Sequence, residues 1–280
     1  MRKFDPIFVT PRVVRRDWGR DDLGDWGRLA PIADGPVGEV WLQDAANATD
    51  NGPLGRRLSS NCAEMFGDLG RAPPRMRLVF PAYDAEIPST APLSFWTLLE
   101  PGYGAGSATR RSGERIRAYE GAAVALPAGS VALEVSSAFQ PDNDFVDEPC
   151  LIRLPPVSKR TRATLAREDA LSVEMWTLPE RSRLSPDGET CHVIMALTPG
   201  VVLDGRQLKM GEAAFIPAHG RAIDLTTRQP VAKAIVAYPD RTPTAIWRHT
   251  PGPGPMPGLL PKPEPWRPAI HAVARLPAAA

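Results

Sequence analysis

The stretch GAAVALPAGSVALEVSS, residues 121–137, has the pattern of a turn, a short strand, a second turn and another strand. Gly121 suits a tight turn that needs a positive φ, and Pro127, after five intervening residues, closes a strand where no ladder donor is required. The same spacing recurs between Gly211 and Pro217. Two such segments, each followed by apolar residues, predict an internal duplication and two tandem β-barrels.

The rest of the chain agrees with an all-β fold. Its 32 prolines and 23 glycines separate short β-prone runs, and many short strands with regular turn signals are typical of sandwiches and barrels. LDGRQ (203–207) supplies an Asp-Gly hairpin turn. Residues 58–70 predict one short helix, with Ser59 or Ser60 as N-cap and Gly67 or Gly70 as stop. The predicted strands are 75–80, 94–99, 122–126, 131–135, 172–178, 191–197, 213–217, 222–225 and 231–238.

Composition excludes several classes of protein. The formal net charge of +1 on 280 residues provides no global field to recruit nucleic acid or an anionic membrane, and no apolar run approaches the length of a transmembrane helix. The N-terminus lacks the apolar region of a secretory signal. The three cysteines have no paired spacing, which favours free thiols in a reducing compartment. We therefore expect a cytoplasmic protein with neither a nucleic-acid nor a membrane partner.

The chain divides into three parts by pattern. Residues 1–165 are predicted to form the first barrel with a short helical insertion, and residues 166–250 the second barrel. Residues 251–280 contain PGPGPMPGLLPKPEPWRP, which is too rich in proline for a packed element. This tail is expected to be an extended polyproline-type arm or a disordered tail.

The N-terminal third resembles one enzyme family. GEVWLQDAANATDNGPLGRRL (38–58) is similar to the GE-x-W and NGPL-x-G segments of bacterial type I mannose-6-phosphate isomerases. The resemblance covers roughly residues 4–250 and implies a divergent member of that family: an all-β bicupin, two tandem cupin-type barrels with a small helical insertion. Further similar stretches are RRDWGRDDL (15–23), SFWTLLEPGYGAG (94–106), EGAAVALPAGS (120–130), LEVSS (133–137) and GEAAFIPA (211–218).

The resemblance also implies a chemistry. The family interconverts mannose 6-phosphate and fructose 6-phosphate with a zinc ion in the N-terminal barrel, held by a Q-x-H pair, a glutamate and a histidine. Here the Q-x-H loop is missing after residues 78–86, Ser94 stands at the glutamate position, and Ala132 stands near the histidine position. The family's basic residue falls near Asp144, and only the strand glutamate, Glu134, is kept. We therefore expect no metal in the first barrel and no cofactor, with zinc as the alternative.

A relocated metal site is one alternative. His192 and His219 lie on neighbouring runs of the second barrel, where Glu174 or Glu189 could add a carboxylate. The other interpretation makes both histidines polar residues at barrel rims or partners of backbone carbonyls.

Several residues are candidates for binding a phosphorylated sugar. Glu39 and Trp41 would line the sugar cleft, although a tryptophan on a strand is as often part of the hydrophobic core. Forked guanidinium contacts suit phosphate, and basic residues occur in RRSGERIR (110–117) and SKRTR (158–162). Solvated hairpin faces are the competing interpretation. The basic candidates are Arg110, Arg111, Lys159 and Arg160.

Two functions follow. The first is a mannose-6-phosphate-isomerase-like protein that has lost the metal site and binds a phosphorylated sugar or acts as a non-catalytic sensor or partner. The second is a working aldose–ketose isomerase, an intramolecular oxidoreductase, with Glu134 as catalytic base and placed donors instead of an ion. The sequence leaves open which sugar is bound, whether a protein partner exists and what the oligomeric state is.

Overall fold

A computed structural model describes ten stretches of the chain. The predicted tail, 251–280, lies outside them. No helix within these stretches is long and apolar enough to cross a membrane. The described residues are 4–29, 35–50, 52–89, 91–104, 111–137, 151–153, 161–168, 170–229, 231–240 and 245–249.

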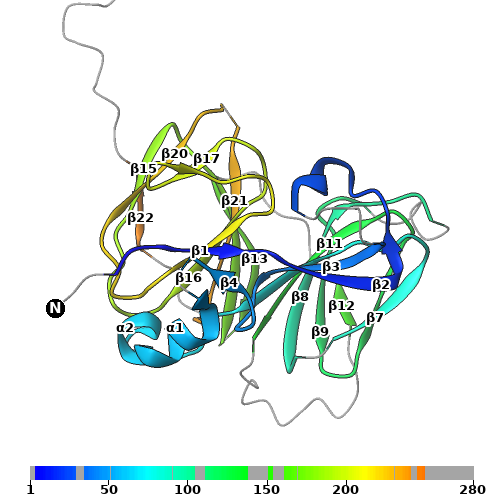
Figure 1. The fold of residues 1–280 in the computed structure, drawn as a ribbon, viewed down its shortest axis with the longest axis horizontal. Coiled ribbons are helices and arrows are strands. Elements are labelled where there is room, and N and C mark those ends of the chain that lie inside the picture. Colours follow the sequence, from blue (N-terminus) through cyan, green and yellow to red (C-terminus); the bar gives the residue numbers. More distant parts are fainter. Residues whose placement is uncertain are drawn as a thin grey trace, which may run out of the picture. The chain divides into compact units, whose positions relative to one another are not determined.

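A seven-stranded antiparallel sheet and a two-stranded ribbon form the first barrel (Figure 1). The ribbon pairs β7 (Ala85–Pro88) with β10 (Ala123–Leu126). Apolar side chains of both layers share one buried cluster, which includes Trp96 and Val124. The sheet has the order β12 (Leu151–Arg153), β9 (Arg115–Tyr119), β8 (Leu93–Glu100), β11 (Val131–Ser137), β6 (Arg75–Val79), β3 (Val37–Gln43) and β2 (Arg12–Arg20).

The second barrel has an eight-stranded and a five-stranded sheet, and Trp176 and Leu225 belong to the cluster buried between them. The larger sheet has the order β13 (Arg162–Glu168), β14 (Leu171–Thr177), β21 (Lys233–Tyr238), β16 (His192–Ala196), β19 (Ala213–Ile216), β1 (Ile7–Thr10), β4 (Ala48–Thr49) and β5 (Gly52–Pro53). The smaller has the order β18 (Arg206–Gln207), β17 (Val201–Leu203), β20 (Ile223–Thr227), β15 (Arg181–Leu184) and β22 (Trp247–His249). The predicted all-β double barrel is confirmed.

The outer faces of the two large sheets share a third apolar cluster. Side chains alternate between the faces of a strand, so Phe95 and Val135 of the first sheet reach this cluster while their neighbours point into the barrel. Val193 and Ile235 enter it from the second sheet. The two barrels are thus held together by a shared apolar core as well as by the backbone.

The duplication exists, but the Gly–Pro spacing does not mark it. Strand order repeats as β6-β11-β8-β9 with β7-β10, and as β14-β21-β16-β19 with β15-β20. The first Gly–Pro pair, Gly121 and Pro127, encloses β10, and by chain order β20 is the counterpart of β10 in the second barrel. The second pair, Gly211 and Pro217, instead encloses β19. Gly121 and Gly211 do have the expected positive φ, 83° and 79°. The two turns are therefore alike locally and sit in different places of the barrel.

Two further turn predictions can be compared with the structure. Asp204 and Gly205 both have positive φ, 52° and 80°, and join β17 to β18 as the predicted hairpin. The predicted single helix was wrong in its start, because α1 (Leu54–Ser60) begins after Pro53 and contains both serines. A break at Asn61, with φ −145°, separates it from α2 (Cys62–Phe66). The predicted stop at Gly67 is confirmed, with φ 83°.

The predicted division of the chain at residue 165 stays a prediction. Strand β1 comes from the segment assigned to the first barrel, yet it pairs with β19 of the second, with Ile7 opposite Phe215. Its alternation explains this placement, because Ile7 and Val9 enter the core between the large sheets while Phe8 packs against the interior of the second barrel.

Candidate functional site

Three charged side chains lie together inside the first barrel. Glu39 on β3, Arg77 on β6 and Glu134 on β11 are 3%, 5% and 2% exposed. Arg77 pairs directly with Glu134 in the sheet register and with Trp41 on its other side. Opposed residues of neighbouring strands point to the same face, here the face of the interior apolar cluster. The predicted residues Glu39, Trp41 and Glu134 are therefore brought together, around an arginine that the sequence analysis did not single out.

Arg77 binds both carboxylates. Its Nη1 lies 3.1 Å from Glu39 Oε2, and its Nε donates to Glu134 Oε2. The guanidinium also lies over the Trp41 and Trp96 rings, 5.1 and 5.5 Å from their centroids. Ion pairs in the plane of the guanidinium and aromatic rings over its faces enclose the cation on several sides.

The remaining carboxylate oxygens are also satisfied. Arg16 Nε donates to Glu39 Oε1 over 3.0 Å, and Trp41 Nε1 donates to Glu39 Oε2 over 2.9 Å. Burial alone would raise the pKa of Glu39, but the charges and hydrogen bonds of Arg77 and Arg16 outweigh it, and the pKa lies below its ordinary value. Arg77, Arg16 and Trp41 therefore keep Glu39 in its ionised form.

Glu134 has a second partner. Ser94 Oγ donates to Glu134 Oε1 over 2.8 Å, and Ser89 Oγ donates to Ser94 Oγ over 3.0 Å. Ser94 stands where the resemblance places a zinc-ligating glutamate, and Ala132, near the histidine position, is buried in the same interior cluster. A hydroxyl and a methyl group stand at these two positions, and the Arg77 guanidinium supplies the positive charge between Glu39 and Glu134.

This donor set does not fit a catalytic zinc site, in which three histidine, cysteine or carboxylate ligands surround the ion and leave one position open. Both carboxylates are already bound by a guanidinium, and no imidazole is among the partners of Glu39 and Glu134. Across the described stretches, no three His, Cys, Asp or Glu side chains form a group that could hold a metal ion.

The second barrel has a related network with the charges exchanged. Glu174 on β14 is 1% exposed and binds Arg162 of β13, with Nη2 to Oε1 at 3.1 Å. Trp176 Nε1 and Tyr238 Oη donate to the same carboxylate over 2.8 and 3.0 Å. In equivalent strand order, the first barrel has Glu39, Arg77 and Glu134 where the second has Arg162, Glu174 and Tyr238. Each barrel thus encloses a set of paired charged side chains beside its apolar cluster.

The two histidines of the alternative metal site have different surroundings. His192 is 1% exposed beside Tyr238, with ring centroids 5.1 Å apart, and burial and the charge of Arg162 lower its pKa to about 3. His219 lies near the end of α2, where its Nε2 is 4.0 Å from Asp68. These contacts give no support to a metal site shared by the two histidines.

The basic run at 110–117 belongs largely to the packing between the barrels. Arg115 is buried, donates to the carbonyl oxygen of Leu165, and burial lowers its pKa. Arg117 pairs with Glu168, so both side chains tie β9 to β13. The expectation of a solvated hairpin face was wrong for Arg115. Arg111 is exposed, while Arg110, Lys159 and Arg160 lie outside the described residues, and their roles stay predictions.

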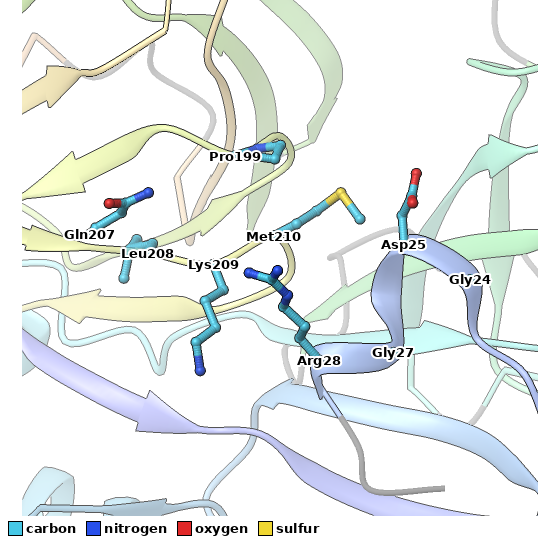
Figure 2. A pocket seen from close by; sticks show the side chains of 9 residues that line it. All are labelled: Gly24, Asp25, Gly27, Arg28, Pro199, Gln207, Leu208, Lys209 and Met210. Carbon is cyan, nitrogen blue, oxygen red and sulfur yellow. The ribbon is translucent and has the colours of Figure 1, made fainter.

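A surface pocket of about 620 Å³ offers a different kind of site (Figure 2). One wall is the 3₁₀ helix η1 (Gly24–Leu29), and the other is the segment from Pro199 through Met210. Arg28 extends from η1 toward that segment, Lys209 adds a second cation, and the Asp25 carboxylate points away from Arg28. Sequence reasoning missed this pocket because its walls are far apart in the chain and neither contains a ligand-binding motif.

Arg77 had a signal that was overlooked. RMRLV alternates charged and apolar residues, and a strand with this pattern places Arg75 and Arg77 on one face and Met76 and Leu78 on the other. The inference that one arginine enters the barrel also needed the strand register.

Comparison with known structures bears on the fold. A mannosephosphate isomerase from Archaeoglobus fulgidus, described as putative, superposes with a TM-score of 0.60 at 15% identity, covering 86% of this chain and 99% of that one. Mannose 6-phosphate isomerases from Bacillus subtilis and, in the apo form, Salmonella typhimurium give TM-scores of 0.52 and 0.57 at 16% and 12% identity, covering 83% and 84% of this chain and 99% of each of theirs. No protein-family model and no curated protein sequence matches the chain. The chain therefore has a cupin-like all-β fold that resembles the mannose-6-phosphate isomerases.

Proposed function

We propose that this chain is a divergent, metal-free relative of the mannose-6-phosphate isomerases that binds a phosphorylated small molecule, with a sugar phosphate as the first candidate, and does not isomerise it. The observation that carries the proposal is the Arg77 guanidinium bound between Glu39 and Glu134. It supplies inside the barrel the positive charge that a metal would bring, without a Lewis-acid position open to a sugar oxygen.

The same network argues against Glu134 as a catalytic base. A general base must come within hydrogen-bond reach of the proton that it removes. Glu134 is 2% exposed, and its two oxygens accept from Arg77 and Ser94. A substrate would have to displace a buried ion pair to reach it, and removal of one partner of such a pair costs about 3–5 kcal/mol.

The proposed ligand site is the pocket between η1 and the 199–210 segment. Its volume of about 620 Å³ lies within the range of small-molecule pockets. Arg28 and Lys209 together provide a forked donor and a point charge, which suit a phosphate, and Gln207 can bond to sugar hydroxyls. The net charge of +1 provides no global field that would recruit nucleic acid or a membrane surface as partner.

Two assays test this function. Conversion of mannose 6-phosphate to fructose 6-phosphate, followed by a coupled enzyme assay with and without added zinc, is expected to stay at background. Turnover that disappears in Glu134→Gln would instead establish the working isomerase.

Calorimetric titration with mannose 6-phosphate, fructose 6-phosphate and inorganic phosphate tests the binding. Arg28→Gln is expected to weaken binding at least tenfold, because a hydrogen bond to a charged group contributes about 1.5–3 kcal/mol. Glu134→Gln, with the fold intact, should leave binding unchanged. The opposite pattern would place the ligand in the first barrel.

A further inference from the structure

A second pocket, of about 540 Å³, has mainly apolar walls. It opens at the border of the core between the two large sheets, where Leu99 and Met175 are only partly buried and Leu165 and Ile235 are buried. Leu197, also partly buried, completes this set of side chains. Apolar surface left uncovered inside a concave site favours an apolar ligand group, because its burial removes more such surface from water.

Two charged residues, Glu100 and Lys233, line this pocket together with the hydroxyl-bearing residues Thr97, Ser112 and Thr198. Trp26 Nε1 donates to Glu100 Oε1 over 2.8 Å. The carboxylate is thereby held against η1. An apolar body with a small number of fixed polar groups is the usual composition of a small-molecule site.

The two pockets adjoin along three segments. Met210 lines both of them. The η1 helix contributes Trp26 to the apolar pocket and Arg28 to the charged one, and the chain from Leu197 to Pro199 passes from one pocket to the other. Methionine is flexible and adapts its shape to its neighbours, so its side chain can yield to a ligand that spans both spaces.

The charged pocket can receive the anionic end of such a ligand. Within the stretches that the structure describes, Arg28 has no acidic partner, whereas Lys209 Nζ is 3.6 Å from Glu212 Oε1. Figure 2 shows Arg28 extending toward the wall that carries Lys209 and Met210. A phosphate at Arg28 would therefore meet an unused guanidinium next to the entrance of the apolar space.

We propose that the two pockets form one site for a phosphate monoester that carries an apolar group. The phosphate binds at Arg28 and Lys209, and the apolar group passes Met210 and occupies the space lined by Leu99, Met175 and Leu197. This inference rests on the proposed function for the phosphate and adds the apolar group, which a simple sugar phosphate lacks.

A chain-length series tests the inference on the full-length protein. Inorganic phosphate, butyl phosphate, hexyl phosphate and octyl phosphate are titrated by calorimetry, below the concentrations at which they aggregate. Each buried methylene is worth about fourfold in affinity, so we expect at least a tenfold gain for every two carbons until the pocket is full.

Variants assign the two halves of the site. Arg28→Gln should weaken every member of the series by a similar factor, at least tenfold. Met175→Gln should leave inorganic phosphate binding unchanged and flatten the dependence on chain length. Arg183→Gln, at an exposed arginine of β15 that lines neither pocket, is the matched control and should change nothing.

The outcomes separate this inference from the proposed function. Affinity that is the same from butyl to octyl phosphate overturns the inference, and the proposed function stands if mannose 6-phosphate still binds in a way that depends on Arg28. A chain-length dependence that survives unchanged in Met175→Gln places the tail elsewhere and also overturns it. Absence of binding by any phosphate overturns both the inference and the ligand part of the proposed function.

Discussion

Replacement of Arg77 by methionine should destabilise the protein in a way that depends on pH. The substitution keeps an unbranched side chain in the barrel but leaves Glu39 and Glu134 without the cation between them, at 3% and 2% exposure. Removal of one partner of a buried ion pair costs about 3–5 kcal/mol. For a domain of this size, 1 kcal/mol corresponds to about 2–4 °C, so the Tm should fall by roughly 6–20 °C.

The pH dependence follows from Glu39. In the native protein its pKa is lowered, so it contributes stability above the unfolded pKa, and this stability is lost as the pH falls through the lower folded value. Without Arg77, burial is opposed mainly by Arg16, and the pKa of Glu39 should rise above the unfolded value. The variant's deficit should therefore be largest near pH 7 and shrink as the pH approaches 4.

Urea unfolding at pH 7, 6, 5 and 4 measures this deficit. The matched control is the triple variant Arg77→Met, Glu39→Gln and Glu134→Gln, which removes all three charges and keeps oxygen acceptors for Trp41 and Ser94. It should recover most of the lost stability, because a buried ion network can be replaced by uncharged groups at little cost. If Arg77→Met alone loses less than about 1 kcal/mol, with no dependence on pH, the ion pairs of Arg77 do not stabilise the barrel as argued.

Two other predictions concern particular residues. Gly67→Ala should cost more than about 3 kcal/mol of stability, because φ is positive and a Cβ would lie 2.4 Å from the Gly188 carbonyl oxygen. Gly70→Ala, where φ is also positive but the space is open, should cost about 1–2 kcal/mol. Equal losses in denaturant unfolding would contradict this difference. Burial lowers the pKa of His192 from 6.5 to about 3. The buried neutral imidazole therefore costs the folded state stability as the pH falls from 6.5 toward 3, because only the unfolded state takes up the proton. Between pH 6 and 4 the native protein should lose about 2–3 kcal/mol more stability than His192→Leu. Parallel stability curves for the two proteins would show that His192 takes up a proton in the folded state.

The strands could be predicted from sequence, and the contents of the barrel only in part. The runs at 75–80 and 131–135 are recovered as β6 and β11 because a short apolar stretch between turn residues is a local property. The contact between Arg77 and Glu134 joins residues 57 positions apart, and it depends on the pairing register of the two strands, which no local pattern specifies.

The same reason explains why the expectations for the Gly–Pro spacing and for Arg115 were incorrect. The repeated Gly–Pro spacing is local, and its equivalence in the fold depends on sheet order, which places β10 and β19 in different positions. From the sequence, Arg115 is expected at the surface because it belongs to a basic run. In the structure, β9 lies against β13 of the other barrel, and the Leu165 carbonyl oxygen accepts a hydrogen bond from the Arg115 guanidinium. The charged pocket depends on η1 meeting a segment from the other half of the chain.

Whether the first barrel binds Arg77 in place of a metal ion can be decided from the metal content of the purified protein. The full chain is expressed in medium supplemented with zinc, freed of loosely bound ions by gel filtration, and analysed for zinc, manganese, iron and cobalt by mass spectrometry. Because Arg77 already binds both interior carboxylates, we expect far less than one equivalent of any metal per chain, with the same result for Glu134→Gln. One equivalent of tightly held metal that is lost in Glu134→Gln would contradict it.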